Sequence, residues 1–503
     1  MALTILVAAA WLLGCGADSS PQGQSRAPDV VLVTVDALRA DVLSLSGWPD
    51  ATSPELDAMA ADSVVFDLAV TSFPGTPPAM TSLMTGLFPW VGAPTAPTKR
   101  TDHGFSDFHP APGRFGVPAE LDTLAEILAR NGYGAIGFNT NPYLNSPSGF
   151  HQGFTEYVEF EPDPEPTSEI EYHALVGKYA PASFVVETIL DRLEEPLPRP
   201  FFLWLHLMDP HSPYLPPPQL ARAFPRTFSD RTDLEINEAV YHEIYRQWGA
   251  TEAADTYPSY KDLGLTRATL REHLLGLYEA EVRYADYELG RLFRRLQELG
   301  RWQTSVVIVT ADHGEELLDH GLVSHHTLNG LKDELIRIPL IVKLPESEAA
   351  GTRVDELVRM VDITPTVLDV VGLGELASGM DGKSLRPYLE GAGDEPRVAP
   401  IVTVGYGMIR TARWKYLHDW NDTTGARGRL FDLAADPTEE RDVAAARPVV
   451  ADELRARLDR VIDHLRARSD GVATQSVSSV DELRLDASTR EQLEGLGYLT
   501  GDN

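Results

Sequence analysis

A short apolar run near the N-terminus, VVLVTV at residues 30–35, constrains the fold most. The run is rich in β-branched residues and has no apolar–polar alternation. It therefore predicts a strand buried on both faces, as in a parallel sheet. Asp36 follows this strand directly. Ligands of open α/β sheets bind just beyond the carboxyl ends of the strands, so Asp36 is a candidate metal ligand. Taken alone, however, a carboxylate in this position more often caps a turn.

Two later apolar runs repeat this pattern and shift the balance towards a functional site. Residues 201–208, FFLWLHLM, precede Asp209 and His211, and residues 305–310, SVVIVT, precede Asp312 and His313. The carboxyl ends of parallel strands meet at one edge of a sheet, where α/β enzymes assemble their sites. Further histidines can bind the oxygens of an ester or protonate a leaving group, although a single histidine is more often structural. They are His206, His320, His325 and His326.

A hydroxyl-bearing residue is predicted at the start of a helix in the segment SFPGTPPAMTSLMTGLFP, residues 72–89. Pro77 and Pro78 suit a first helical turn, and Gly86 suits a C-terminal stop. Thr76 would then lie at the helix N-terminus, where backbone N–H groups and the helix dipole favour an anion. Thr76 is a candidate nucleophile. Considered alone, the role of a plain N-cap is the more common one.

Asp36, Asp312, His313 and Thr76 supply mixed oxygen and nitrogen donors that suit one hard or borderline divalent metal ion. A metal that touches the threonine oxygen would lower the pKa of the hydroxyl. A second metal site is a weaker hypothesis. Its ligands would be Asp209, His211 and His326.

The rest of the chain predicts an alternation of helices and strands, followed by a change of character near residue 400. Helices are expected over 53–61, 120–132, 269–299, 361–371, 449–468 and 487–496, with Ser53 as the N-cap of the first. Strands are expected over 64–69, 134–141 and 338–344, and short antiparallel strands over 400–404, 408–418 and 430–433. Residues 156–172 are expected to be a solvated acidic insertion, and residues 214–266 an excursion that shapes the pocket.

Composition and the N-terminus limit location and partners. The 503 residues carry a formal net charge of −32, which argues against nucleic-acid binding. Residues 3–13 have the length of a signal-peptide core, and LLGC resembles the bacterial lipoprotein box. Cys15, the one cysteine, would then carry a lipid, unless it is incidental to an ordinary signal peptide. We expect a lipoprotein signal over residues 1–15, a flexible tether over 16–28, and export to the periplasm or cell surface. The lipid is expected to be the one contact with a membrane, and Gly16 after Cys15 leans towards the outer membrane.

Several motifs in the same order as in a known family give the chain a resemblance to the sulfatases of the alkaline phosphatase superfamily. The resemblance covers about residues 28–467. It implies a large α/β sandwich around a mostly parallel sheet, over residues 29–395, and a small C-terminal subdomain with an antiparallel sheet, over residues 396–503. The motifs include VTVDALRADVLS, TPPAMTSLMTGLFP, LWLHLMDPHSPYLPP, VIVTADHGEELLDHG, DELIRIPLIVKLP and IRTARWKYLHD.

The resemblance also implies roles for individual residues. Asp36, Asp312 and His313 would bind the metal, which is calcium by family habit, although the histidine makes Mn²⁺, Mg²⁺ or Zn²⁺ suitable. Thr76 would be the nucleophile and a metal ligand. His211 and His320 would be catalytic. The substrate would be bound by Asn141, His206 and His326, with His325 as an alternative to His326.

The chain departs from the sulfatase pattern at the nucleophile. Sulfatases carry Cys-x-Pro-Ser-Arg there and oxidise the cysteine to formylglycine, whereas this chain has Thr76, Ala79 and Met80. The usual second acid after Asp36 is Ala37. Threonine cannot form the aldehyde, so no formylglycine is expected. A threonine nucleophile instead resembles phosphotransferring relatives.

Three functions follow in order of preference. The first is a metal-dependent hydrolase or transferase that uses Thr76 on phosphate or phosphonate esters of small molecules, glycans or lipids. The second is a sulfuric ester hydrolase that works without formylglycine. The third is a catalytically inactive surface lipoprotein that binds an anionic glycan, which the replacements at Ala37, Ala79 and Met80 favour.

Overall fold

The structure is a computed structural model that describes part of the chain. Cys15, His326 and the helix expected at 487–496 lie outside the described residues. The described residues are 27–89, 116–160, 179–221, 224, 232–247, 254–255, 257–325, 330–393, 397–403, 405–420 and 428–473.

An eight-stranded sheet forms the centre of the molecule, in the order β10-β2-β9-β6-β1-β5-β3-β4. β9 runs antiparallel to β2 and β6, and the other neighbouring pairs run parallel. The mostly parallel sheet is therefore confirmed. The strands are β1 (Asp29–Val35), β2 (Val64–Val70), β3 (Gly134–Asn139), β4 (Glu156–Glu159), β5 (Phe201–Leu207), β6 (Ser305–Ala311), β9 (Arg337–Lys343) and β10 (Thr352–Arg359).

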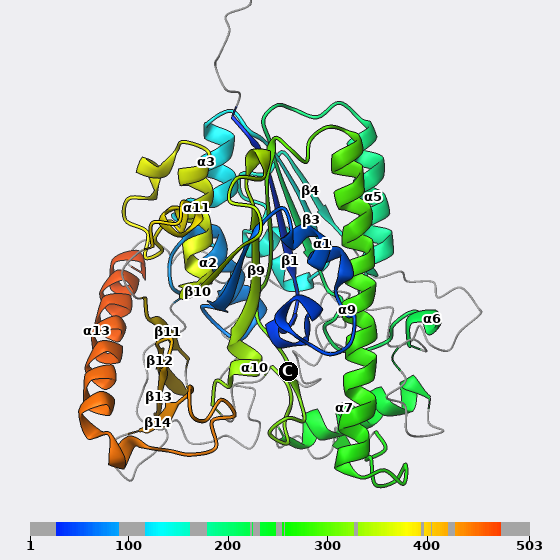
Figure 1. The fold of residues 1–503 in the computed structure, drawn as a ribbon, viewed down its shortest axis with the longest axis vertical. Coiled ribbons are helices and arrows are strands. Elements are labelled where there is room, and N and C mark those ends of the chain that lie inside the picture. The colour runs from blue at the N-terminus through cyan, green and yellow to red at the C-terminus, as the bar shows by residue number, and fades with distance from the viewer. Residues whose placement is uncertain are drawn as a thin grey trace, which may run out of the picture.

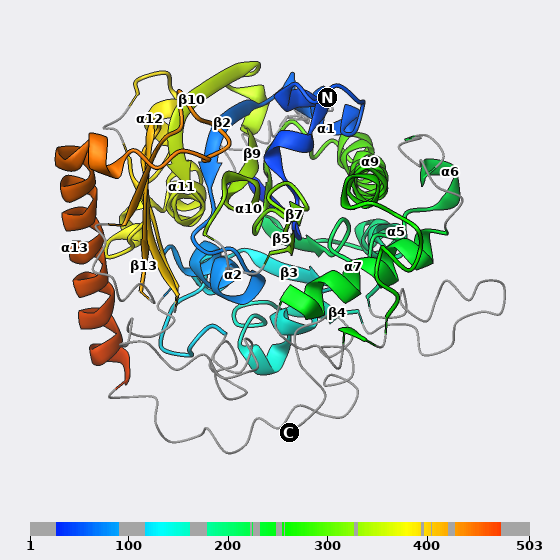
Figure 2. The same cartoon turned by 90° about the horizontal axis from the view of Figure 1, so that it is seen from below.

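Helices cover both faces of this sheet, as Figures 1 and 2 show. One face carries α1 (Pro54–Ala60), α5 (Ala182–Glu194) and α9 (Arg267–Glu298). The other carries α2 (Thr76–Thr85), α3 (Leu124–Arg130) and α11 (Ile363–Val370). β1 is buried along its whole length, because strands and helices surround it on every side. The shorter helices are α6 (Pro218–Ala221), α7 (Asp233–Gln247), α10 (Asp333–Ile336) and α12 (Arg386–Leu389).

A second, smaller sheet begins at Ala399 and confirms the predicted antiparallel C-terminal part. Its strands follow chain order and pair antiparallel. α13 (Pro448–Ala473) packs on its outer face, where Ile409 and Leu458 belong to one buried cluster (Figure 1). The strands are β11 (Ala399–Val402), β12 (Tyr406–Arg410), β13 (Trp414–Asp419) and β14 (Arg429–Asp432).

Several predicted elements need correction. The strand expected at 408–418 is two strands, because the chain turns between Thr411 and Trp414, whose backbone groups are hydrogen-bonded at 2.8 Å. The solvated insertion expected at 156–172 begins as the edge strand β4, which pairs with β3. The helix expected at 120–132 begins at Leu124, because Thr123 caps it in a capping box. α5 and β10 were not predicted.

Candidate active site

The site lies where four neighbouring parallel strands end. In the order β6-β1-β5-β3, these strands or the loops directly after them carry Asp312, Asp36, His206 and Asn141. The strand register pairs Thr34 with His206 and Thr310, and His206 with Asn139, so the four strand ends lie level with one another. The sheet order therefore places the ends of β1, β5 and β6 side by side.

A sharp turn after β1 brings the two candidate acids together. Ala37 has a φ of 55°, a left-handed conformation that a residue with a Cβ adopts at some cost. Its backbone N–H donates to Asp312 Oδ1 at 3.1 Å, and its carbonyl accepts from the Tyr278 hydroxyl at 2.7 Å. Ala37 thus lacks the second acid of the family pattern but ties Asp36 to Asp312 through its backbone.

The two carboxylate oxygens of Asp36 have different surroundings. Oδ2 accepts from Asn141 Nδ2 at 2.7 Å and lies 3.2 Å from His206 Nε2. Oδ1 is buried and has no hydrogen-bond partner within the described part of the chain. Burial raises the pKa of Asp36, but His211, His206 and His313 outweigh it, and the pKa lies well below its usual range. Asp36 is therefore ionised, with one oxygen available to a ligand.

Asp312 shows the same division. Its Oδ1 accepts from the backbone N–H groups of Ala37 and His313, the latter at 2.8 Å. Its Oδ2 is buried and, among the described residues, makes no hydrogen bond. Burial and the charge of Asp36 raise the pKa of Asp312. Two neighbouring carboxylates are both ionised only where positive charge lies beside them, and a bound cation would supply it.

His313 completes this group. Its Nδ1 lies 2.8 Å from the Gly314 carbonyl, so Nδ1–H donates there and Nε2 is left to act as a ligand. Nε2 lies 3.4 Å from Asp312 Oδ2 and 3.8 Å from Asp36 Oδ1. Burial lowers the pKa of His313, but Asp312 and Asp36 raise it above its usual value. Two buried oxygens without hydrogen bonds and one ring nitrogen converge, which fits a divalent metal ion.

Thr76 faces this group. It is the first residue of α2, and Gly75 is the N-cap, so Thr76 does not cap its own helix. Its Oγ1 lies 3.4 Å from Asp36 Oδ2 and 3.4 Å from His313 Nε2. The expected row of free N–H groups is reduced, because Pro77 and Pro78 have none and Ala79 donates to the Gly75 carbonyl. The hydroxyl, rather than the helix backbone, is what α2 presents.

His206 belongs to the carboxylate group and was predicted to bind substrate. Ligand atoms of Asp36, His206 and Asp312 lie within 4.8 Å of one another, so His206 is a further candidate ligand. Its Nδ1 lies 2.8 Å from Thr34 Oγ1, which in turn accepts from Trp204 Nε1 at 3.0 Å. Its ring is completely buried, and these contacts orient it towards Asp36. The structure likewise places Asn141 on Asp36.

Three histidine rings form a row that begins at His313, the histidine that contacts Thr76. The centroid of His325 lies 4.4 Å from that of His313 and 5.1 Å from that of His211. Burial, followed by His313, lowers the pKa of His325 well below its usual value, so His325 is neutral. His211 is buried, and its Nδ1 lies 2.7 Å from the Ser212 carbonyl oxygen. Nδ1 is therefore the ring nitrogen that contacts this carbonyl, and Nε2 points away from it. Of the two alternatives at this place, His325 is the one that the structure describes.

Glu315 and Tyr214 were missed by the sequence reasoning. Glu315 is fully buried, and the Tyr214 hydroxyl donates to its Oε2 at 3.0 Å. Its Oε1 lies 3.6 Å from His325 Nδ1, and burial raises the pKa of Glu315 to about 7. The signal was its position two residues after His313, in the same turn that leaves β6.

Asp209 and His320 lie in other surroundings. Asp209 Oδ2 accepts from the Ala182 backbone N–H at 2.8 Å, at the start of α5. Burial raises the pKa of Asp209 to about 6, and burial together with Asp209 raises the pKa of Glu281 well above its usual value. His320 Nε2 lies 3.2 Å from Glu334, in a separate group of possible ligands.

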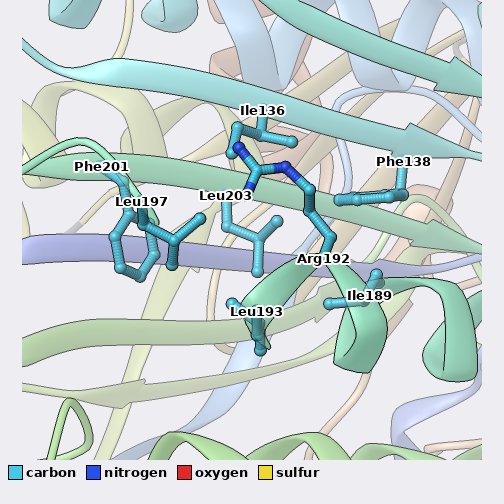
Figure 3. Close-up of a pocket in the computed structure, with 8 residues that line it drawn as sticks. All are labelled: Ile136, Phe138, Ile189, Arg192, Leu193, Leu197, Phe201 and Leu203. Atoms are coloured by element: carbon cyan, nitrogen blue, oxygen red, sulfur yellow. The ribbon is translucent and has the colours of Figure 1, made fainter. Parts of the chain in front are cut away.

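A narrow pocket between α5 and strands β3 and β5 is unrelated to these residues. Figure 3 shows that apolar side chains line it, with Arg192 the one charged residue among them. Arg192 is already bound by both carboxylate oxygens of Glu156, at 2.7 and 2.8 Å. The pocket therefore offers no group for ester cleavage.

Comparison with known proteins adds the family. A family model described as "Sulfatase" matches residues 28–373, and one described as "N-sulphoglucosamine sulphohydrolase, C-terminal" matches residues 326–468. The chain belongs to the sulfatase family. It is a sulfatase-family hydrolase of the alkaline phosphatase superfamily, as the motifs predicted.

Relatives of this sulfatase-family chain cover most of its length. The ulvan-active sulfatase of Formosa agariphila is 24% identical over 472 residues, which span 87% of this chain and 82% of the relative. Arylsulfatase K of Homo sapiens is 25% identical over 480 residues, which span 89% and 84%. The solved phosphonate monoester hydrolase of Agrobacterium radiobacter shares the fold, with a TM-score of 0.64, 22% identity, and coverage of 88% and 96%.

Members of this family typically bind a divalent metal, and Asp36, His206 and Asp312 offer suitable ligand atoms. Within the described residues, no helix has the length and apolar character that crossing a membrane requires.

Proposed function

We propose that this sulfatase-family hydrolase cleaves or transfers phosphate or phosphonate esters, with unmodified Thr76 as the nucleophile. The observation that carries the proposal is the position of Thr76 Oγ1, 3.4 Å from both Asp36 Oδ2 and His313 Nε2. A module that only binds its ligand needs no hydroxyl at the centre of buried acids and a histidine.

One divalent metal ion is part of the proposal. Asp36 Oδ1, Asp312 Oδ2 and His313 Nε2 would hold it, with Thr76 Oγ1 and His206 as further candidates. The bound ion would lower the pKa of the hydroxyl and offset the charge of the ester. Three or more mixed oxygen and nitrogen donors suit Mn²⁺, Mg²⁺ or Zn²⁺ as well as Ca²⁺.

The side chains divide the remaining chemistry. Thr76 Oγ1 bonds to phosphorus as the bond from phosphorus to the leaving oxygen breaks, and the threonine proton passes to Asp36 Oδ2. Protonated His211 supplies a proton to the leaving oxygen. In the second step water, or an acceptor alcohol in a transfer reaction, gives its proton to His211 and bonds to phosphorus. The Oγ1–phosphorus bond breaks, and Oγ1 takes back the proton from Asp36, which restores Thr76. Since His320 lies with Glu316 and Glu334, we assign the leaving-group role to His211 alone.

Phosphorus is preferred over sulfur for a chemical reason. Formylglycine releases sulfate when its hydrate collapses to the aldehyde, and a sulfated threonine has no such route. Threonyl phosphate can be displaced by ordinary metal-assisted attack. A phosphonate monoester hydrolase shares the fold, so the fold accommodates esters of phosphorus as well as of sulfur. Sulfate-ester hydrolysis is the second candidate, because the relatives at the sequence level are named as sulfatases.

A substrate panel tests the proposal. Wild type and Thr76→Ala are assayed with an aryl sulfate, a phosphate monoester, a phosphodiester and a phosphonate monoester, each with Ca²⁺, Mg²⁺, Mn²⁺ and Zn²⁺. We expect turnover of a phosphorus ester by wild type, and a loss of at least about 10³-fold in Thr76→Ala with its metal content retained.

Two results would overturn the proposal. Equal ester turnover by wild type and Thr76→Ala would remove the nucleophile. If metal-loaded wild type turned over none of the four esters, the anionic-glycan-binding function would take its place. Turnover of the aryl sulfate alone, lost in Thr76→Ala, would establish the second candidate.

The location of the protein is a separate proposal. We infer that a lipid on Cys15 anchors an exported protein, so that its glycan, lipid or small-molecule substrate is met outside the cytoplasm. The motivation is the apolar run that ends in LLGC. Replacing Cys15 with Ser and fractionating the cells would test it, since a variant that remains in the membrane fraction contradicts the anchor.

A further inference from the structure

A second group of possible metal ligands lies on the hairpin that follows β6. The hairpin pairs β7 (Glu316–Leu317) with β8 (Val323–Ser324), and α10 packs beside it. One ligand atom from each of three residues lies within 4.8 Å of the other two. These residues are Glu316 at the start of the hairpin, His320 in its turn, and Glu334 in α10.

The carboxylate of Glu316 points to a missing partner. Glu316 is 1% exposed, and neither of its carboxylate oxygens makes a hydrogen bond within the described part of the chain. Burial raises the pKa of Glu316 to about 7. A buried carboxylate with no hydrogen bond is unfavourable, and native proteins rarely keep one without an ion, a water molecule or a partner to satisfy it.

Two arginines from other parts of the chain bind a different acid of this hairpin, Asp319. Arg39 Nη1 and Arg271 Nη2 each lie 2.6 Å from a carboxylate oxygen of Asp319. Arg39 also donates to Asp41 at 2.8 and 3.0 Å. Neither guanidinium therefore serves as the hydrogen-bond donor that the Glu316 carboxylate lacks.

We infer that Glu316, His320 and Glu334 bind a divalent transition-metal ion, Zn²⁺ or Mn²⁺, separate from the ion at Asp36. Two carboxylates and an imidazole form a donor set that suits these ions. His320 Nε2 lies 3.2 Å from Glu334 Oε1. Ligands at the usual zinc bond lengths in a tetrahedral site are about 3.3 Å apart, so these two atoms already have the spacing of a metal pair.

Such an ion would fix the hairpin against α10. The backbone N–H groups of Gly314 and Glu315 donate to the carbonyls of Leu335 and Glu334, at 2.8 and 3.1 Å. The ends of the hairpin carry Glu315 and His325, which lie beside His211 and His313 in the active site. The role of the ion is therefore to position these side chains, and it takes no part in the bond-breaking step.

Metal content separates the two sites and does not depend on the mechanism of Thr76. Four proteins are loaded with Zn²⁺ or with Mn²⁺, freed of excess ion and analysed for metal: wild type, Asp312→Asn, Glu316→Gln and the double variant. Asn retains the Oδ1 acceptor at position 312. We expect Glu316→Gln to remove one bound ion, both from wild type and from the Asp312→Asn protein. In the Asp312→Asn protein the metal is expected to raise the melting temperature, and in the double variant this increase should disappear.

A second variant and a control complete the experiment. His320→Ala alters a half-buried side chain at the turn and is expected to lose the same ion as Glu316→Gln. Glu348→Gln removes an exposed carboxylate and should leave metal content and thermal stability unchanged. Equal metal content in Glu316→Gln, His320→Ala and their parent would overturn the inference.

Discussion

Asp36 is the residue around which the site is arranged. Its position after a buried strand was predictable, because an apolar run followed by an acid marks the carboxyl end of a parallel strand. Its neighbours were less so. The sequence suggests substrate binding for Asn141 and His206, and it gives no sign that both contact Asp36 Oδ2. Strand alternation and motif order predict which end of the sheet a side chain lies at. They do not predict whether that side chain contacts a substrate or the neighbouring Asp36.

Removal of the Asn141 amide is expected to weaken metal binding. Its Nδ2 donates to Asp36 Oδ2 at 2.7 Å and so orients the carboxylate. Loss of such an outer partner typically lowers metal affinity about 10- to 100-fold, and we expect this for Asn141→Ala in a metal titration. Asn145→Ala is the matched control, because Asn145 also caps a short 3₁₀ turn but contacts none of the candidate ligands. Equal metal affinity in the two variants would contradict the role.

His211 is expected to matter most for esters with poor leaving groups. Its Nε2 would supply the proton that a strongly basic alkoxide needs, whereas 4-nitrophenolate leaves without one. We expect His211→Gln to lose about 10²- to 10⁴-fold in kcat for an alkyl ester, and far less for the 4-nitrophenyl ester of the same acid. An equal loss for both leaving groups would assign His211 to binding or structure.

Among the elements, long apolar strands and the long helix were predictable, and edge elements were not. β1, β5 and β6 are buried on both faces, which makes them continuous apolar runs. β10 is an edge strand with exposed charged residues and a register shift after Val354, so its sequence lacks such a run. Ser53 is the N-cap residue of α1, as predicted, but its side chain does not bond to the helix backbone.

Asp286 of α9 caps α1 in place of Ser53, and its removal should destabilise the protein. Its carboxylate accepts from the backbone N–H groups of Glu55 and Leu56, at 3.0 and 2.8 Å. We expect Asp286→Ala to lower the free energy of unfolding by about 1–2 kcal/mol, measured by urea denaturation. Asp191→Ala, an exposed acid on α5, is the control. A stability equal to that of the control would show that the cap contributes nothing.

Across the whole molecule, a cluster of charges joins the large sheet to the C-terminal sheet. Asp333 of α10 pairs with Arg410 of β12 and Lys415 of β13, at 2.7 and 3.0 Å, and Lys415 also pairs with Glu439. The two-part architecture was predictable from the change in strand pattern near residue 400. This junction was not, because its partners are about 80 residues apart in sequence, as Asp333 and Lys415 illustrate.

The junction predicts a dependence of stability on pH. Burial raises the pKa of Asp333, but Lys415 and Arg410 outweigh it, and the pKa lies well below the ordinary value of 3.8. The ion pairs therefore stabilise the fold above pH 3.8, and this stabilisation is lost as the pH falls further below that value. We expect Asp333→Asn to be less stable than wild type by about 3 kcal/mol at pH 7, with the difference shrinking in acid.

Thermal and urea unfolding across this pH range would measure the difference. Asp432→Asn is the matched control, because Asp432 pairs with Arg413 within the C-terminal sheet at its solvent-exposed side. A difference between Asp333→Asn and wild type that stays constant from pH 7 into acid would contradict the pH dependence.

The covalent state of Thr76 during turnover tests the proposed mechanism most directly. Metal-loaded wild type is mixed with an aryl phosphonate monoester, quenched with acid at successive times, digested and analysed by mass spectrometry. We expect the phosphonyl group of the substrate, without its ester aryl group, on the peptide that contains Thr76. We expect no aldehyde at that residue, and neither the adduct nor turnover in Thr76→Ala. Full turnover by Thr76→Ala, with the wild-type peptide unmodified at every time, would contradict the mechanism.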